Sequence, residues 1–287
     1  MFTIKTKGWL IYSLEDSKKN KSYINWFIEE ARLQNISLEL ILREDLTIAI
    51  MDNERTILLH NKQVDLPVFA IVRTIEPFLN SHLETCDIKV FNSSQVSNLC
   101  NHKSLTHHEV NKLCIPMVDT IFINKENLNS KLPMSPPFVV KESTGRSGKQ
   151  VYFIRAAKDW EQCLTRLSTS NLVIQACNVI LGKDVRVFII GKEVIGAVLR
   201  ESTNDFRANY GLGGSAKWYP LNNEELALIH KIVQHFDFDM VGIDFLIGLD
   251  GKFLFNEIED VVGSRILSAV SDINILEKYV THIKTQL

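Results

Sequence analysis

The stretch Pro137–Phe153, PFVVKESTGRSGKQVYF, restricts the fold of this chain more than any other. An apolar strand ends in Lys141, a turn of small residues with two glycines follows, and a second strand returns. Such a turn can lay backbone N–H groups and one positive charge over a polyphosphate. Most Gly/Ser hairpins bind nothing, so a phosphate site needs support from elsewhere in the chain. The stretch is not a P-loop, because Ser143 and Gln150 stand where that motif has Gly and Ser or Thr.

Composition restricts the class of protein. The chain has 287 residues, 45% of them hydrophobic and 23% charged, which is typical of a soluble globular protein with room for two or three lobes. A net charge of −2 argues against a nucleic-acid partner. Five cysteines without C-x-x-C spacing predict a reducing, cytoplasmic location. Because the sequence has neither a signal peptide nor a membrane-spanning run, no membrane partner is expected.

Residues 1–92 are predicted to form a small N-terminal α/β domain. The expected elements are a strand over 7–13, an amphipathic helix capped by Ser17 or Asn20, a hairpin turning at Asp52–Asn53 and a strand over 68–74. Arg73 ends the last of these strands, where an open sheet exposes ligand contacts. It is therefore a candidate substrate residue, with an ordinary surface arginine as the alternative.

Two short helices are expected next, one after Asn92 and one over 102–113 with Lys103 at its start. The histidines of the second helix have no nearby cysteine or carboxylate pattern, so we interpret them as solvated and not as metal ligands. Beyond the glycine-rich hairpin, DVRVFIIGKEVIGAV predicts another hairpin, which turns at Gly191–Lys192.

Carboxylates near the end of the chain predict a metal site. Glu257 and Glu259 are two residues apart on an expected strand, so their side chains share one face. Asp244 lies on the preceding strand, within pairing reach. Hard oxygen donors that converge in this way fit Mg²⁺, whereas a solvated sheet face is the alternative. The apolar runs MVGI and FLF favour the metal site.

Together these features resemble a known family. Lys103, the loop KESTGRSGK, the run IQAC, the hairpin DVRVFIIGKEVIGAV, the loop DFRAN and the acids of GIDF and NEIE occur in the order and spacing of ATP-grasp enzymes. The match is closest to the RimK-like carboxylate–amine ligases and covers roughly residues 90–287. It implies an α/β (α+β) fold in which the N-terminal lobe precedes two ATP-clamping lobes with antiparallel sheets, at 93–171 and 172–287.

The resemblance also implies residue roles, with ATP and two Mg²⁺ ions (or Mn²⁺) as cofactors. Lys103 and Lys141 hold phosphates, and Gly145, Ser147 and Gly148 cover them. Gln175, Ala176 and Cys177 face adenine through backbone groups, and Asp184 lies at the ribose or the nearby surface. Arg186, Arg207 and Asn209 face the transferred phosphoryl group, and Asp244 and Glu257 bind Mg²⁺. Catalytic roles fall to Arg207, Arg186 and Lys141.

The sequence departs from the family at its final motif. Glu259 stands where RimK-like ligases usually have Asn, and the usual Ser-Pro-Gly turn is missing. A carboxylate at 259 can still bind Mg²⁺. Arg265, beside the altered turn, can bind a substrate carboxylate or phosphate through two hydrogen bonds. Arg73, Arg200 and Arg265 are therefore the candidate substrate contacts.

The predicted activity is ATP-dependent joining of a carboxylate to an amine through an acyl phosphate, on small amino-acid-like substrates. One alternative is modification of a peptide or protein; another is nucleotide binding without ligase activity. The oligomeric state is left open, with a homodimer or a higher assembly among the alternatives.

Overall fold

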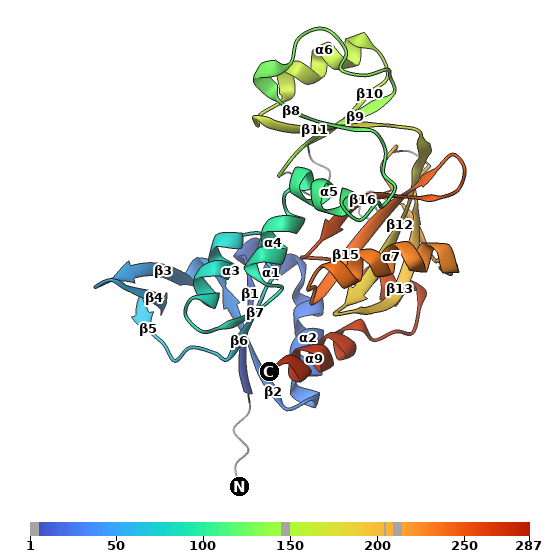
Figure 1. Ribbon diagram of the computed structural model, residues 1–287. Coiled ribbons are helices and arrows are strands. Elements are labelled where there is room, and N and C mark those ends of the chain that lie inside the picture. Colours follow the sequence, from blue (N-terminus) through green and yellow to red (C-terminus); the bar gives the residue numbers. More distant parts are fainter. Residues whose placement is uncertain (1–5, 145–149, 204, 209–213) are drawn as a thin grey trace.

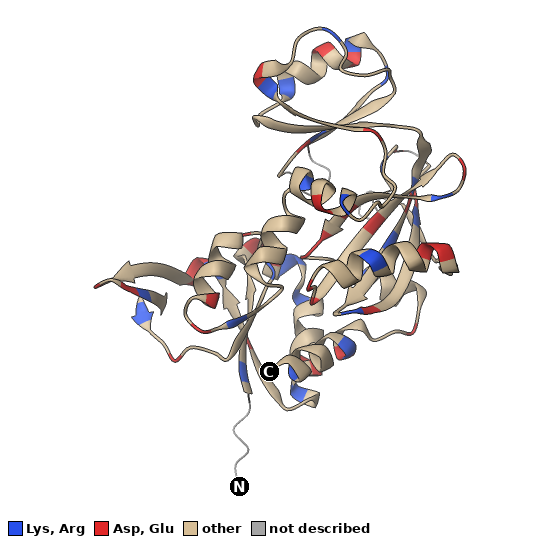
Figure 2. Cartoon of the chain, viewed as in Figure 1, with Lys and Arg blue, Asp and Glu red and all other residues tan. Residues whose placement is uncertain are grey.

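The computed structural model describes residues 6–144, 150–203, 205–208 and 214–287. The chain forms three parts, each built on its own sheet (Figure 1). Figure 2 shows acidic and basic residues interspersed over all three, in keeping with the small net charge. The mixture of a parallel α/β part with antiparallel lobes agrees with the predicted fold class.

A parallel sheet of order β2-β1-β6-β7 forms the N-terminal part. Its elements are β1 (Thr6–Tyr12), α1 (Leu14–Lys19), α2 (Lys21–Leu33), β2 (Ile36–Leu42), β6 (Phe69–Val72), α3 (Pro77–Glu84) and β7 (Lys89–Phe91). The predicted amphipathic helix is α2, and its N-cap residue is Asn20; the alternative cap, Ser17, is wrong because it lies within α1, which Ser13 caps by accepting from the Asp16 N–H. Asn20 precedes α2 without a side-chain capping bond.

A small antiparallel sheet extends from this part. It consists of β3 (Leu46–Met51), β4 (Glu54–Leu59) and β5 (Lys62–Gln63). The hairpin between β3 and β4 turns at Asp52–Asn53 as predicted, and both residues have positive φ, a conformation that Asn and Asp adopt more readily than most residues.

The middle sheet has the order β10-β9-β11-β8 and is antiparallel. Its elements are β8 (Thr120–Asn124), β9 (Phe138–Glu142), β10 (Val151–Ile154), α6 (Ala157–Arg166) and β11 (Asn171–Ala176). α6 covers one face of this sheet (Figure 1). It does so through Trp160, which is fully buried and packs edge-on against Phe138.

The C-terminal sheet is antiparallel and has the order β14-β13-β12-β15-β16. Its strands are β12 (Val179–Ile190), β13 (Glu193–Glu201), β14 (Ser215–Trp218), β15 (Met240–Gly248) and β16 (Phe253–Glu259). Three helices follow or interrupt them: α7 (Asn223–His235), α8 (Arg265–Val270) and α9 (Ile275–Gln286). The hairpin between β12 and β13 turns at Gly191, which has φ +56, as predicted.

The two faces of this sheet have different neighbours. Val185 and Val187 belong to the same apolar core as α7, whereas Phe188 and Ile190 belong to a core shared with α2 and α9. Side chains alternate along a strand, so Asp184 lies on the second face. The linking helices α4 (Ser94–Cys100) and α5 (Lys103–Asn111) contribute residues to the core on the α7 side.

Asn92 joins the N-terminal part to the C-terminal sheet. Its buried side-chain amide donates to the carbonyls of Met240 (2.8 Å) and Asp260 (3.2 Å). Its oxygen accepts from the N–H groups of Asp239 (2.7 Å) and Met240 (3.2 Å). α9 adds a second joint, because Tyr279 packs on Phe27 of α2. In the described part of the chain, no helix has the length and apolar character needed to cross a bilayer.

Candidate active site

A cavity of about 220 Å³ lies between the middle and C-terminal sheets. Most of the predicted site residues with described positions line it: Lys103, Lys141, Gln175, Ala176, Cys177, Asp184, Arg200, Arg207, Glu257 and Glu259. Phe153 of β10 stacks on Phe206 at 4.8 Å and links the two lobes beside the cavity. Cationic and acidic groups from separate lobes therefore line one cavity.

Lys141 and Lys103 stand on one wall. Lys141 lies near the end of β9, and its Nζ donates to Asn256 Oδ1 of β16 at 2.8 Å. Burial lowers the pKa of the Lys141 ammonium, and Glu257 opposes that shift. Lys103 begins α5, and its backbone N–H donates to the Ser143 carbonyl at 2.8 Å. This hydrogen bond joins the end of β9 to the start of α5. It therefore places Lys103 and Lys141 on the same side of the cavity.

Four predicted residues lie outside the described part of the chain: Gly145, Ser147, Gly148 and Asn209. Their roles at the phosphates stay predictions. The strands that flank the glycine-rich turn are described, and they pair as predicted, with Lys141 opposite Val151.

Gln175 is the penultimate residue of β11, lines the cavity and is held by a buried histidine. His107 Nδ1 lies 2.8 Å from the Lys103 carbonyl, which can only accept, so Nδ1 carries the proton. Burial lowers the pKa of His107 to about 4, so the ring is neutral near pH 7 and Nε2 is an acceptor. The group that faces Nε2 at 3.0 Å is consequently the NH₂ of Gln175. Its Oε1 then points away from the ring, buried and without a hydrogen-bond partner among the described residues.

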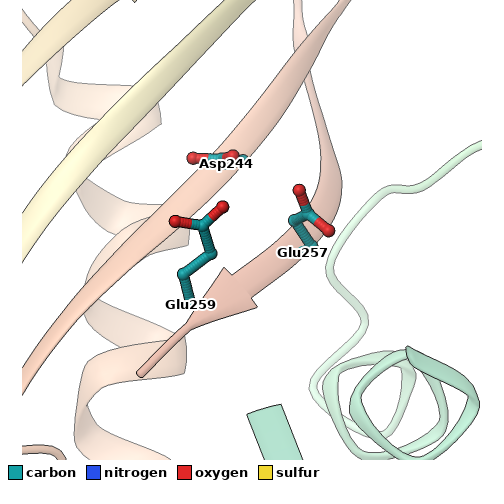
Figure 3. A group of neighbouring side chains, drawn as sticks. All are labelled: Asp244, Glu257 and Glu259. Carbon is teal, nitrogen blue, oxygen red and sulfur yellow. The ribbon is translucent and has the colours of Figure 1, made fainter. Parts of the chain in front are cut away.

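The structure brings the three predicted metal acids together. Asp244 on β15 stands opposite Glu257 on β16, and Glu259 lies two residues further on. One carboxylate oxygen from each lies within 4.8 Å of the other two, and the side chains point toward one another (Figure 3). Three hard oxygen donors in this arrangement fit Mg²⁺, which takes few protein carboxylates and keeps positions for water and phosphate.

Two arginines neutralise part of this cluster. Arg186 makes two 2.7 Å bonds to Asp244 and one 2.8 Å contact to Glu259. Arg200 makes two bonds to Asp184, at 2.6 and 2.7 Å, and one to Asp244 at 2.7 Å. Burial acts to raise the pKa of the Asp244 carboxyl, but Arg186 and Arg200 overcome it and bring the pKa to about 2. Asp184, expected near a ribose, is engaged by Arg200.

Arg207 lies at the cavity in the loop after β13. It makes a two-pronged ion pair with Asp205, with contacts of 2.9 and 2.6 Å. Its guanidinium also lies over the Phe206 ring, 5.4 Å from the centroid. The pair with Asp205 orients the arginine but also competes for the donors that a phosphoryl group would use.

The remaining candidate arginines lie apart from the metal acids. Arg73 is buried; it donates to the Val262 carbonyl at 2.8 Å and lies over the Tyr23 ring. Its Nε has no hydrogen-bond partner in the part of the chain that the structure describes. It is therefore not the surface arginine that was the alternative. Arg265 is exposed and donates to Asn20 Oδ1 at 3.1 Å.

Two site residues were missed by reasoning from the sequence. Asn256 holds Lys141 because a β-bulge follows Asp244 in the register of β15 and β16, and nothing in the alternation of FLFNEIE signals that bulge. His107 was interpreted as solvated, but it is buried between Gln175 and the ring of Phe255, 5.3 Å away. The one available signal was its spacing of four residues from Lys103, which puts both on one side of a helix.

Comparison with known proteins identifies a family. The profile of the RimK-like ATP-grasp domain matches residues 100–283. Human N-acetylaspartylglutamate synthase A is 28% identical over 247 residues, which cover 80% of this chain and 63% of the relative. The chain thus spans less than two thirds of that relative's length. The glutamate–LysW ligase ArgX of Sulfurisphaera tokodaii is 26% identical over 237 residues, 78% of this chain and 84% of the relative.

Solved structures share the fold. The ATP-grasp ligase PsnB, solved with a minimal precursor, superimposes with a TM-score of 0.72 at 15% identity, covering 99% of this chain and 100% of PsnB. Another PsnB structure, with a phosphomimetic precursor variant, Mg and ADP, has a TM-score of 0.69 at 16% identity and covers 99% of each chain.

Proposed function

The chain belongs to the RimK-like ATP-grasp family, and we propose that it joins a carboxylic acid to an amine while ATP is converted to ADP and phosphate. The observation that carries the proposal is the composition of the cavity. Lys103, Lys141, Glu257 and Glu259 all line it. Cations for phosphates and acids for a metal, in one site between two lobes, suit phosphoryl transfer from a nucleotide.

The proposed reaction has two steps. A carboxylate oxygen of the acid attacks the γ-phosphorus, the bond to the ADP oxygen breaks, and an acyl phosphate forms. The neutral amine then attacks the acyl carbon, and phosphate leaves. Both steps depend on positioning and charge neutralisation more than on a covalent side chain. Lys103 and Lys141 hold the phosphates, and Arg207 and Arg186 stabilise the charge that develops on the transferred group.

Asp244, Glu257 and Glu259 are the residues that would hold Mg²⁺. A metal held by these carboxylates would supply positive charge to offset the charge of the nucleotide phosphates. The protein's own contribution is to converge these acids and to offset their repulsion with Arg186 and Arg200. Gln175, Ala176 and Cys177 form the wall for the base. The five free cysteines fit a reducing cytoplasm as the site of action.

The substrates are proposed to be small and amino-acid-like, with Arg73, Arg200 and Arg265 as candidates for binding the acid. One relative is named as a synthase of N-acetylaspartylglutamate, whereas the ligase PsnB was solved with a precursor peptide. Modification of a peptide or protein is therefore the second candidate. Incubation with an amino-acid panel and with peptides, read by mass spectrometry, separates the two.

The test of the ligase activity uses Lys141→Ala and Glu257→Ala. Wild-type protein should form ADP and a new amide from Mg-ATP, an acid and an amine. Each variant should lose most of that activity while binding less ATP. Activity near the wild-type level in both variants would contradict the proposal. Tight Mg-ATP binding by wild-type protein with no ADP formed from any acid and amine would favour nucleotide binding without ligase activity.

A further inference from the structure

Five charged side chains form one continuous row on the C-terminal sheet, with acids and bases alternating. The order is Asp184, Arg200, Asp244, Arg186 and Glu259. Each neighbour in the row is joined by a contact of 2.6–2.8 Å. Asp184 stands directly opposite Arg200, and Arg186 directly opposite Asp244, so cross-strand pairing builds the row.

The two ends of the row are held differently. Asp184 is buried and receives two bonds from Arg200. Glu259 makes a single contact to Arg186, and its side chain is 38% exposed, compared with 1% for Asp244. Breaking the contact between Arg186 and Glu259 therefore isolates no buried charge, because Arg186 keeps its two bonds to Asp244 and Glu259 is partly exposed.

This end of the row coincides with the metal acids. Asp244 and Glu259 are two of the three carboxylates whose oxygens converge, and the Arg186 guanidinium bridges them. A second cation among the same oxygens would be repelled by the guanidinium at this distance. Arg186 thus neutralises part of the charge of these acids, and Glu259 competes with any other anion for the Arg186 guanidinium.

We propose that Glu259 is a positioning residue for Arg186. It holds the guanidinium across the metal acids while the site is empty and releases it to phosphate oxygens when nucleotide binds, whereas Asp244 keeps its two bonds throughout. A polyphosphate carries more negative charge than one carboxylate, and its oxygens can accept two hydrogen bonds from a planar guanidinium just as a carboxylate does. The inference rests on the proposed nucleotide site and adds that Glu259 sets the affinity of that site for nucleotide.

The test compares two substitutions that remove the same charge from the same cluster. Glu259→Gln breaks the contact with Arg186. Glu257→Gln is the matched control, because in the described part of the chain Glu257 forms no salt bridge with Arg186. Binding of ATP is measured by calorimetry in EDTA, so that no metal ion obscures the competition between Glu259 and the ATP phosphates for Arg186. Glu259→Gln should bind ATP about tenfold more tightly than wild type, the size expected when one charge-assisted hydrogen bond no longer competes.

Glu257→Gln should gain much less, because only the general repulsion falls. Equal gains in the two variants would overturn the inference, since charge alone would then explain both. In an Arg186→Lys background, which lacks the bidentate guanidinium, the gain in ATP affinity from Glu259→Gln should shrink to that from Glu257→Gln. An undiminished gain in ATP affinity there contradicts the proposal. Failure of wild-type protein to bind ATP with Mg²⁺ would instead contradict the proposed function itself.

Discussion

Arg186 and Asp244 face each other across β12 and β15, and their side chains form two parallel 2.7 Å hydrogen bonds. Both groups are buried, so each depends on the other for its charge. Arg200 adds a third bond to the same carboxylate. Asp244 therefore contributes both to stability and to the proposed function, because the acid expected to bind a metal is also the anion that pairs with Arg186 and Arg200 in the sheet.

Acid should destabilise the protein through Asp244. Its pKa is about 2 in the folded chain, against 3.8 ordinarily, because Arg186 and Arg200 outweigh burial. A carboxyl with a lowered pKa stabilises the fold above its unfolded pKa, and that contribution is lost as the pH falls through its folded pKa. We expect the free energy of unfolding to drop by about 2 kcal/mol from this group between pH 4 and pH 2.

Urea titrations over that pH range measure the drop. The slope with pH should be shallower in Asp244→Asn by about this amount. Asp272→Asn, at an exposed position, is the control and should keep the wild-type slope. An unchanged slope in Asp244→Asn would mean that the arginines do not hold its charge in the folded state.

Local chemistry made part of the fold predictable. The hairpins at Asp52–Asn53 and at Gly191 follow from turn residues that tolerate positive φ between apolar runs. The choice between the two predicted caps of α2 was not predictable in this way. Ser17 and Asn20 are both suitable capping residues, but a separate short helix, α1, begins directly after Ser13 and includes Ser17, which leaves Asn20 as the cap.

The candidate site was predictable where it depends on strand periodicity. Glu257 and Glu259 share a face because side chains alternate, and the pairing with Asp244 follows from two adjacent strands. The contact of Lys141 with Asn256 depends on a bulge, and the burial of His107 depends on Phe255, which is far away in the sequence. Neither contact is signalled by residues that are close together in the sequence, so neither could be predicted from the sequence.

Arg207 should matter for rate more than for stability. Its side chain is 28% exposed in a loop, so Arg207→Ala should leave the melting temperature nearly unchanged. Loss of one donor to the developing charge should lower kcat about a hundredfold or more. The rate of ADP formation with saturating ATP measures this effect.

Arg155→Ala is the control for that experiment. Arg155 also pairs with an aspartate, Asp159, but on the exposed surface of the middle lobe and away from the cavity lining. It should keep the wild-type rate. Similar rates in the two variants would remove Arg207 from the proposed catalytic residues.

Gln175 should govern recognition of the nucleotide base. His107 fixes its amide so that Oε1 is left as an acceptor, and a buried acceptor without a partner is unfavourable by about 1–3 kcal/mol until a ligand supplies a donor. Gln175→Met removes the acceptor at similar volume. We expect KM for ATP to rise about tenfold with kcat little changed, and the preference for ATP over GTP to weaken. A fall in kcat at unchanged KM would argue against this role.

Asn92 should be essential to the joint between the N-terminal part and the C-terminal sheet. Its amide serves both N–H and C=O groups of Met240, together with the Asp239 N–H and the Asp260 carbonyl. Asn92→Ala leaves these buried backbone groups without partners, and we expect a loss of about 3 kcal/mol in the free energy of unfolding. Asn223→Ala, at an exposed helix start, should change the free energy of unfolding by less than about 0.5 kcal/mol.

The Asn92 variant should also weaken Mg-ATP binding, because Asp260 directly follows Glu259 on the chain. Calorimetry on the folded protein measures this affinity. Intact affinity would mean that the joint supports the fold without positioning the metal acids.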